Sequence, residues 1–212
     1  MNPTPILSLL LSAALLSLSP DPGFAQQAAA LDPAKAKATL STRPPRNPVK
    51  SAAAITKRTY ERRAAKGLEV ETGPSASSDT VDVEVVHRAD GTTEVRPYVP
   101  LPILFVVGAD TLLDATSREN VDEMARILID LCSSEKAKFS VQGHTSAEGA
   151  GSDNQALSDR RAARIQGLLA AKGVDATALT AIGIGEDSAQ FAEDASEQQR
   201  QQDRRVLIVR MK

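Results

Sequence analysis

A short polar segment and an arginine downstream of it have the residue types needed to hold a carboxylate. The segment is Gly143-His144-Thr145-Ser146, and it directly follows an alternation of apolar and polar residues that is typical of a strand. A polar loop at a strand end is a common place for a ligand, and we attribute to Gly143 a sharp turn of the backbone. Arg161 follows Ser146 by fifteen residues, and its planar guanidinium can donate two hydrogen bonds to one carboxylate. Taken alone, Arg161 could equally be an exposed helix arginine.

Other chemistry finds little support in the residue types. His144 has only His87 as a second histidine, so no histidine metal cluster is expected, and no nucleophile motif accompanies it. We therefore give His144 no catalytic role and interpret it as a structural residue of the loop, where it is one of the candidate ligand-binding residues. Gly183-Ile184-Gly185 lacks the third glycine of a phosphate loop and is better interpreted as a strand end. The sequence predicts no enzyme, no metal and no cofactor.

Composition excludes two further classes of ligand. The net charge is −2, which does not favour a nucleic-acid partner. Aromatic residues make up 3% of the chain and tryptophan is absent, which argues against platforms that stack on sugars or on single-stranded nucleic acid. Polar side chains are therefore the expected means of recognition.

Hydrophobic periodicity predicts alternating strands and helices around these residues. The segments expected to form strands are the runs 103–107, 179–184 and 206–209 and the segment 139–142, in which apolar and polar residues alternate. Thr116-Ser117-Arg118-Glu119 resembles a capping box at the start of one helix. Ser152 or Asp153 is expected to cap a second helix, which ends at Gly173. The predicted fold is an α/β sandwich in which the helices pack on one sheet.

The rest of the chain divides into three expected segments. Residues 1–25 combine an apolar stretch with small residues before a cleavage point, which predicts an export signal. Residues 26–80 are basic and rich in alanine and proline, which predicts low order, and their charge suits either an anionic envelope surface, a protein partner or a solvated linker. Residues 81–100 predict a hairpin followed by a stiff, proline-rich connection, so the main domain is expected to span 101–212.

Several short motifs in this last segment together resemble the OmpA C-terminal domain family, which includes Pal-type and MotB-type proteins. They are, in chain order, Gly143-His144-Thr145, Asn154, Leu157-Ser158-Asp159-Arg160-Arg161-Ala162, Gly183-Ile184-Gly185-Glu186 and Asp203-Arg204-Arg205-Val206. The resemblance implies an OmpA-like βαβαβ(α)β arrangement on one mixed sheet. It also implies non-covalent binding of the diaminopimelate-containing peptide stem of peptidoglycan, with Arg161 on the carboxylate and with Thr145, Asn154 and Arg204 lining or supporting the pocket.

The sequence departs from the family pattern at the position expected to hold the ligand's ammonium. Ser146 stands where the family usually has aspartate, so the charge is missing. Loss of one member of a charge-assisted pair typically costs about 1.5–3 kcal/mol, or roughly tenfold to a hundredfold in affinity. Glu148, two residues on, is a candidate replacement. Asp203 in place of asparagine and Ala189 in place of proline are further departures.

Two functions remain open from the sequence. The first is a Gram-negative envelope protein, exported to the periplasm, that binds peptidoglycan and so associates peripherally with the cell wall or outer membrane. The second keeps the fold as a scaffold for protein–protein contact that has lost or weakened this binding, with Ser146 as the mark of the change. If the Glu148 carboxylate faces Arg161, binding is favoured, whereas a pocket filled by side chains favours the scaffold.

Overall fold

A computed structural model describes residues 27–44, 69–73, 81–87 and 93–211 of the chain. Its helices are α1 (Pro33–Ser41), α2 (Ala115–Glu135), α3 (Gly151–Ala171) and α4 (Glu197–Asp203), with a short 3-10 helix η1 (Ala176–Ala178). Its strands are β1 (Glu69–Gly73), β2 (Val83–His87), β3 (Thr93–Leu101), β4 (Phe139–His144), β5 (Leu179–Gly185) and β6 (Val206–Arg210). The expected export signal at 1–25 and most of the basic segment lie outside the described residues.

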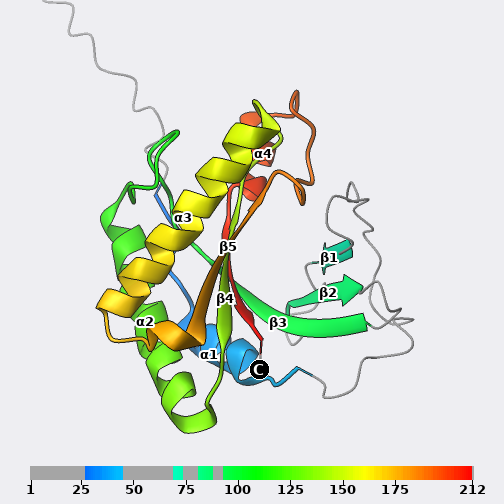
Figure 1. Cartoon of the computed structure of the whole chain (residues 1–212). Helices are drawn as coiled ribbons and strands as arrows, with labels where there is room; N and C mark the ends of the chain where they lie inside the picture. Colours follow the sequence, from blue (N-terminus) through cyan, green and yellow to red (C-terminus); the bar gives the residue numbers. More distant parts are fainter. Residues whose placement is uncertain (1–26, 45–68, 74–80, 88–92, 212) are drawn as a thin grey trace, which may run out of the picture.

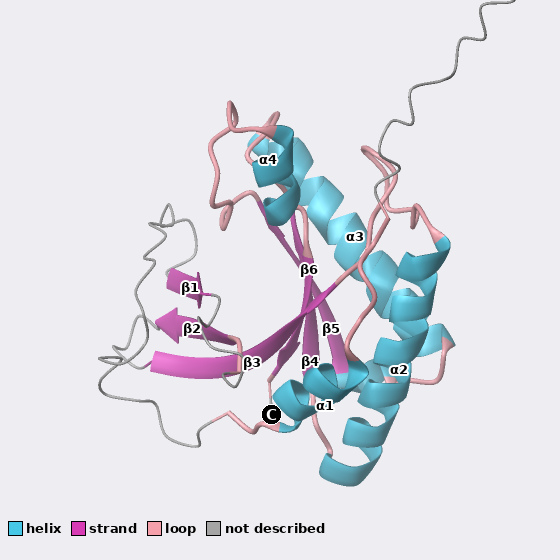
Figure 2. Ribbon diagram, turned by 180° about the vertical axis from the view of Figure 1, so that it is seen from behind, coloured by secondary structure: helices cyan, strands magenta, loops and turns pink. Residues whose placement is uncertain are grey.

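The strands form one mixed sheet, which confirms the predicted α/β architecture. Their order is β1-β2-β3-β6-β4-β5, and only the β4–β5 pair is parallel. Strand β6 runs antiparallel to both of its neighbours, β3 and β4. Helices α1, α2 and α3 lie on one side of the sheet, as Figures 1 and 2 show from opposite directions. The chain order places the ends of β4 and β5 beside the beginning of α3.

The core lies between the sheet and α2 and α3. Residues from α2, α3 and the central strands form one buried cluster that includes Met124, Leu128, Leu131, Phe139, Val141, Ile165, Leu169 and Ile208. The opposite face of the sheet has a smaller cluster of Tyr98, Leu207 and Val209. Alternation along β6 explains the division, because neighbouring residues of a strand face opposite sides. The alternation therefore determines which side chains of β6 face α2 and α3 and which face the opposite side of the sheet.

The strand expected at 103–107 is wrong, because β3 occupies that place in the sheet. Tyr98 to Leu101 of β3 pair with Val209 to Val206 of β6. Residues 103–107 leave the sheet, and the isolated bridge between Phe105 and Leu112 is their pairing among the described residues. The side chain of Val107 is 97% exposed. A continuous apolar run is equally compatible with a buried strand and with an apolar wall at the surface, and periodicity does not separate the two.

Of the three prolines expected to form a stiff connection, Pro97 and Pro100 lie inside β3, and Pro102 follows directly after it. Pro97 pairs with Val83 of β2, whereas Pro100 pairs with Leu207 of β6. Proline has no N–H to donate, so it is tolerated where a strand has a partner on one side only. Strand β3 changes partner near Tyr98, and each proline lies in a stretch with a single partner. The strand therefore runs without interruption through the boundary expected between residues 100 and 101.

Both predicted helix caps are replaced by neighbouring residues. Helix α2 begins at Ala115, two residues earlier than a cap at Thr116 would place it, because the Asp114 carboxylate accepts a hydrogen bond from the backbone N–H of Ser117 at 2.6 Å. Helix α3 begins at Gly151 after Ala150, which provides no side-chain cap. Asp153 lies in its first turn, where a negative charge is favourable for the helix dipole. Gly173 follows α3 with a positive φ of 99°, as predicted for a helix end.

Part of the segment expected to be poorly ordered is a helix packed on the domain. Asn120 of α2 accepts a hydrogen bond from the Leu31 N–H and donates to the carbonyls of Ala29 and Pro102. At the other end of α1, Arg210 donates to the carbonyl of Leu40 at 2.6 Å. Buried Ala36 and Leu40 join the main core. The alanine-rich composition of this segment does not predict the packing of α1, because the residues that hold the helix, Asn120 and Arg210, lie far from it in the sequence. No helix in the described part of the chain is long and apolar enough to cross a membrane.

Candidate functional site

The end of β4 lies against α3 because two glycines allow it. A Cβ on Gly143 would lie 2.4 Å from the carbonyl oxygen of Ser158, and one on Gly183 would lie 2.3 Å from the Asp159 carboxylate. Both glycines are inside strands, paired with each other between β4 and β5. The turn attributed to Gly143 is therefore wrong. Its role is to let α3 approach the sheet closely, which brings the helix side chains to the strand ends.

Polar side chains of α3 fix the helix to β5 at this point. The Gly185 N–H donates to Ser158 Oγ at 2.9 Å, and the Gly183 N–H donates to Asp159 Oδ1 at 3.0 Å. Gln155 Nε2 donates in turn to the carbonyl of Gly183 at 3.0 Å. Ser158 is fully buried. The Leu-Ser part of the motif thus sets the position of α3, and Arg161, three residues after Ser158, is held with it.

A cavity of about 410 Å³ opens where the ends of β4, α3 and α4 meet the connection from β3 to α2. It is lined by Ile103, Leu104, Phe105, Val107, Gly108, Leu113, Thr145, Ser146, Glu148, Asn154, Leu157, Arg161, Glu197, Gln201 and Arg204. Six of the seven residues proposed from the sequence as ligand-binding are in this set. They come from three separate parts of the chain, which are the loop after β4, helix α3 and the end of α4, and the fold brings them together.

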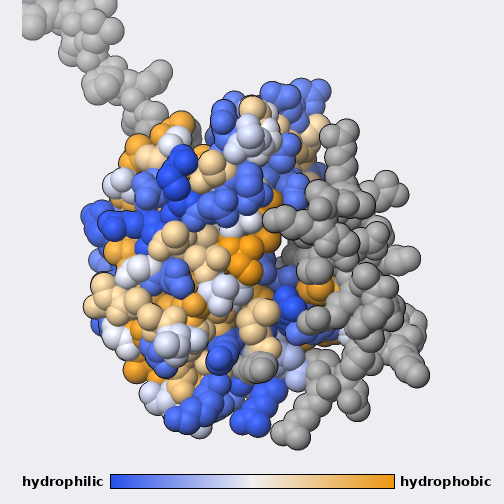
Figure 3. Space-filling model, viewed as in Figure 1, coloured by the Kyte–Doolittle hydropathy of each residue, from blue (hydrophilic) through white to orange (hydrophobic). Residues whose placement is uncertain are grey.

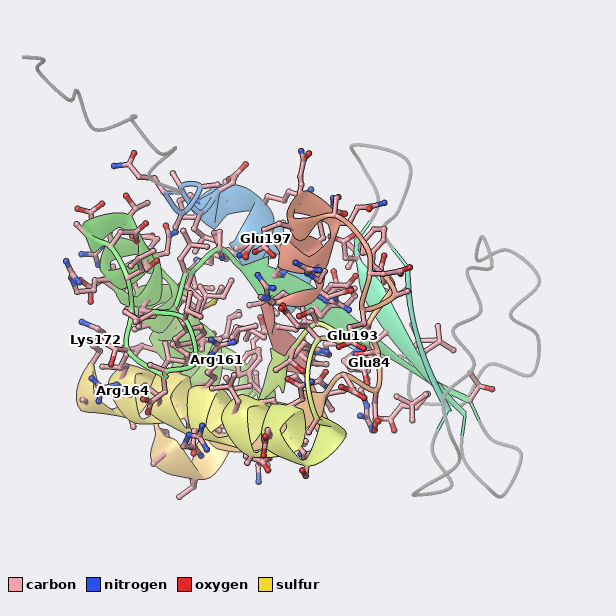
Figure 4. The ribbon with its side chains drawn as sticks, turned by 90° about the horizontal axis from the view of Figure 1, so that it is seen from above. Glu84, Arg161, Arg164, Lys172, Glu193 and Glu197 are labelled. Atoms are coloured by element: carbon pink, nitrogen blue, oxygen red, sulfur yellow. The ribbon has the colours of Figure 1, made fainter. Side chains whose placement is uncertain are left out.

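Arg161 is buried in the wall of this cavity without an acidic partner among the residues that the structure describes. Its side chain is 6% exposed, and its Nε donates to the carbonyl of Ala109 at 3.0 Å. The guanidinium carbon lies 4.7 Å from the centre of the Phe105 ring, which supports the cation from one side. Figure 4 shows Arg161 between α3 and the connection that leads to α2. The alternative of an exposed surface arginine is therefore wrong.

The electrostatic surroundings of Arg161 oppose its charge. Burial, followed by the positive charges of Arg204 and Arg160, lowers the pKa of Arg161 to about 10, against a smaller opposite effect of Asp110. A pKa near 10 still leaves the guanidinium charged at neutral pH. A buried cation without a counter-ion is costly for a protein and gains from an added anion. The arrangement is suited to binding a carboxylate that enters from the cavity.

Arg204 occupies the position beside Ser146. Its Nε donates to Ser146 Oγ at 3.3 Å, and its Nη2 donates to Glu148 Oε2 at 2.9 Å. Its Nη1 also forms an ion pair with Glu197 of α4. Hydrogen bonds from Arg204 and then Arg200 lower the pKa of Glu197, and the pKa of Arg204 is raised in return. Glu148 thus faces Arg204 rather than Arg161.

Asn154 and Thr145 shape the loop that carries Ser146. Asn154 Nδ2 donates to the carbonyl of Glu148 at 2.9 Å and to Glu186 Oε2 at 2.6 Å. The Thr145 N–H donates to the carbonyl of Gly185 at 2.9 Å. The hydroxyl oxygen of Thr145 is buried and has no hydrogen-bond partner in the described structure. Asn154 therefore supports the cavity wall, while Thr145 brings an unused polar group to it.

His144 lies outside the cavity. Its side chain is 3% exposed, and its Nδ1 is 2.7 Å from the hydroxyl oxygen of Ser188 in the loop after β5. Asp203 anchors the same loop, because its carboxylate accepts from the N–H groups of Gln190 and Phe191. The departure at Asp203 therefore concerns the loop and not the cavity. Within the described residues, no cluster of histidine, cysteine and acidic side chains could hold a metal ion.

Sequence reasoning missed one whole wall of the cavity. This wall is made of apolar residues of the β3–α2 connection, among them Ile103, Leu104, Phe105 and Leu113. They belong to or follow the run that was assigned to a buried strand. The prolines at 97, 100 and 102 and the turn signal at Gly108-Ala109-Asp110 were present, but they do not show that the run faces a ligand. Glu197 and Gln201 of the polar α4 were missed as well.

Comparison with known proteins assigns the part of the chain that forms the cavity to a family. The model of the OmpA family matches residues 104–205. Among solved structures, the chain is similar to the periplasmic domain of Helicobacter pylori MotB, with 21% identity, coverage of 55% of this chain and 81% of that chain, and a TM-score of 0.46. It is also similar to the peptidoglycan-associated lipoprotein of Burkholderia pseudomallei, with 22% identity, 51% and 88% coverage, and a TM-score of 0.45.

A putative MotB-like protein of Desulfovibrio vulgaris shows 25% identity over 55% of this chain and 74% of that chain, with a TM-score of 0.42. The assignment rests on the family match, since every one of these TM-scores is below 0.5. The match begins at Leu104 and ends at Arg205, so it includes every residue that lines the cavity except Ile103, and both helices that carry its polar residues. Residues 104–205 of this chain are a domain of the OmpA family, a family of non-enzymatic binding domains.

Proposed function

We propose that this chain is an exported protein of the Gram-negative cell envelope that binds peptidoglycan non-covalently. The ligand is the diaminopimelate-containing stem peptide, and Arg161 receives one of its carboxylates. The protein then lies in the periplasm, peripherally associated with the cell wall or the outer membrane. Such an association links the wall to the outer membrane or to an envelope complex, and makes or breaks no covalent bond.

One observation carries this proposal. Arg161 is a buried guanidinium that lines an open cavity and has no acidic partner among the described residues. An arginine that only stabilises a fold is paired internally, because an uncompensated buried charge is costly. Membership of the OmpA family adds the class of ligand, since peptidoglycan is what the resemblance implies for this site.

The position of Glu148 and the state of the cavity bear on the two functions left open by the sequence, which are peptidoglycan binding and a protein–protein scaffold. Its carboxylate is paired with Arg204 at 2.9 Å, which does not favour a replacement for the missing aspartate. The cavity, however, is open at about 410 Å³ and is not filled by side chains. The second property favours ligand binding over the scaffold for protein–protein contact. The scaffold remains the alternative function if the wall is not bound.

Co-sedimentation with peptidoglycan sacculi of the diaminopimelate type tests the proposal. The purified protein is expected to pellet with the sacculi, whereas Arg161→Ala is expected to stay in the supernatant. Arg164→Ala is the matched control, because Arg164 is an exposed arginine on the same helix. Failure of the unmodified protein to pellet would overturn the proposal and favour the scaffold. Equal pelleting of Arg161→Ala would remove Arg161 from the binding site.

A further inference from the structure

The hydroxyl of Ser146 is in contact with a positively charged group. Arg204 Nε lies 3.3 Å from Ser146 Oγ, and it donates its hydrogen bond to that oxygen. A ligand ammonium placed at Ser146 would therefore face a guanidinium at close range. Like charges at such distances repel strongly in a partly buried site. Serine in place of the family's aspartate thus removes the attraction for a ligand ammonium and also leaves that ammonium beside the positive charge of Arg204.

The two carboxylates that line the cavity are already engaged by arginines. Glu148 pairs with Arg204 at 2.9 Å and with Arg200 at 3.6 Å. Glu197 pairs with the same two arginines. An incoming ammonium would have to compete with both guanidinium groups for either carboxylate. Arg161 remains the cation in the cavity wall without an acidic partner among the described residues, so this end of the site favours an anion.

Uncharged polar groups and apolar surface complete the cavity. The Ser146 hydroxyl accepts from Arg204, and its hydrogen remains available to donate, while the buried Thr145 oxygen has no partner in the described structure. Hydroxyls of this kind match the carbonyl and N–H of an amide. The opposite wall includes Leu113, which is 51% exposed, and Val107. Figure 3 shows apolar surface at the tip of the connection between β3 and α2.

These observations define the form of the ligand. We infer that the cavity prefers a carboxylate whose neighbouring nitrogen is acylated, as in a stem peptide cross-linked through its diaminopimelate amine, over the same carboxylate beside a free ammonium. Acylation removes the charge that Arg204 would repel, and the acyl group gives the apolar wall a partner. This inference rests on the proposed function. It makes cross-linked peptidoglycan the preferred ligand over stem peptides that are not cross-linked.

Calorimetric titration with two synthetic tripeptide stems tests the inference. Both stems end in meso-diaminopimelate, and they differ only in whether the distal amine is free or acetylated. The unmodified protein is expected to bind the acetylated stem at least about tenfold more tightly, which corresponds to about 1.4 kcal/mol. Ser146→Asp is expected to reverse this preference, and Arg161→Ala to weaken both stems alike.

The outcomes separate the inference from the proposed function. Equal binding of the two stems, or tighter binding of the free amine, overturns the inference and leaves peptidoglycan binding intact. Binding of neither stem by the unmodified protein overturns the proposed function and the inference together. Thermal melting checks that Ser146→Asp is folded. If it is not, Arg204→Gln removes the positive charge beside Ser146 and is expected to reduce the preference for the acetylated stem.

Discussion

A buried arginine lies at each end of the central strands, and the two arginines differ in their partners. At the end where β6 finishes, Arg210 is 1% exposed, donates to the Leu40 carbonyl at 2.6 Å and pairs with Glu135 at 3.0 Å. At the end where β6 begins, Arg161 is 6% exposed and donates to the carbonyl of Ala109, with an aromatic ring in place of a carboxylate. Arg210 is paired within the fold, whereas Arg161 has no acidic partner among the described residues and can bind an anionic ligand.

This contrast teaches how a stable domain accommodates an unfavourable charge. Arg210 ties three segments together, since it reaches α1, α2 and β6 at once. Arg161 is instead held by its position on α3, which Ser158 and Asp159 fix to β5. The rigid attachment of the helix allows the guanidinium to remain charged and in place before any ligand arrives. The four predictions that follow test this division between a stabilising end and a binding end.

Replacement of Arg210 is expected to have the largest effect on stability. Arg210→Met leaves the Leu40 carbonyl and the Glu135 carboxylate without their buried donor, which costs about 3 kcal/mol of unfolding free energy. Denaturant titration measures this loss. Arg161→Met is the matched control and is expected to change stability by less than about 1 kcal/mol, because no ion pair is broken. Similar losses in the two variants would remove the contrast between the two ends.

Addition of one methyl group at Gly143 is expected to have the next largest effect. The Cβ of Gly143→Ala would lie 2.4 Å from the Ser158 carbonyl oxygen, so α3 must move away from β4. Such overpacking typically costs about 2 kcal/mol, and we expect the sacculus binding of the folded fraction to fall too. The control is Gly167→Ala in α3, where a Cβ meets nothing within 4 Å. That change is expected to stabilise the domain by about 0.5–1 kcal/mol.

Removal of the cap of α2 is expected to have a smaller effect that depends on pH. Asp114→Ala loses the hydrogen bonds to the N–H groups of Ser117 and Ala28, at a cost of about 1 kcal/mol near neutral pH. The hydrogen bond from Ser117 lowers the pKa of the Asp114 carboxyl from its ordinary 3.8. The contribution of this group is therefore complete above pH 3.8 and disappears as the pH falls through the lower folded-state pKa. Melting curves of the two proteins should converge in acid, and a constant difference would contradict this assignment.

Removal of the Glu197 charge is expected to have the smallest effect on stability. Glu197 is largely exposed, and exposed ion pairs contribute about 0–1 kcal/mol. Glu197→Gln should therefore leave the melting temperature nearly unchanged, while Arg204 keeps Glu148 as a partner. We expect carboxylate binding to be retained, because Arg161 is unaltered. A large loss of stability would mean that α4 depends on this pair.

Several parts of the fold could be predicted because they depend on local patterns. Alternation of apolar and polar residues predicts the strand at 139–142, apolar runs predict those at 179–184 and 206–209, and Gly173 predicts the end of α3. The hairpin of β2 and β3 was found from its alternation of residues. The position of β3, by contrast, depends on the competition between residues 93–101 and 103–107 for the place beside β6. Such a competition is decided by tertiary pairing and not by local propensity.

The candidate site shows the same division. Arg161, Ser146, Thr145, Asn154, Glu148 and Arg204 were proposed from residue types and spacing, and they line one cavity. His144 was proposed with them, but alternation along β4 and its contact with Ser188 place it elsewhere. Glu148 could not be assigned in advance, because its partner is an arginine 56 residues away. Charge pairing across such separations depends on the packed structure.

The sequence by itself determined the order of helices and strands from α2 to β6, the family motifs and the serine in place of an acid. These properties follow from side-chain periodicity and residue identity, which act over a few neighbouring positions. Only the tertiary structure decided that Arg161 has no acidic partner among the described residues, that Arg204 lies beside Ser146 and that an apolar wall faces them both. The physical reason is that electrostatic energies depend on distance and burial, and both are set when remote segments pack together.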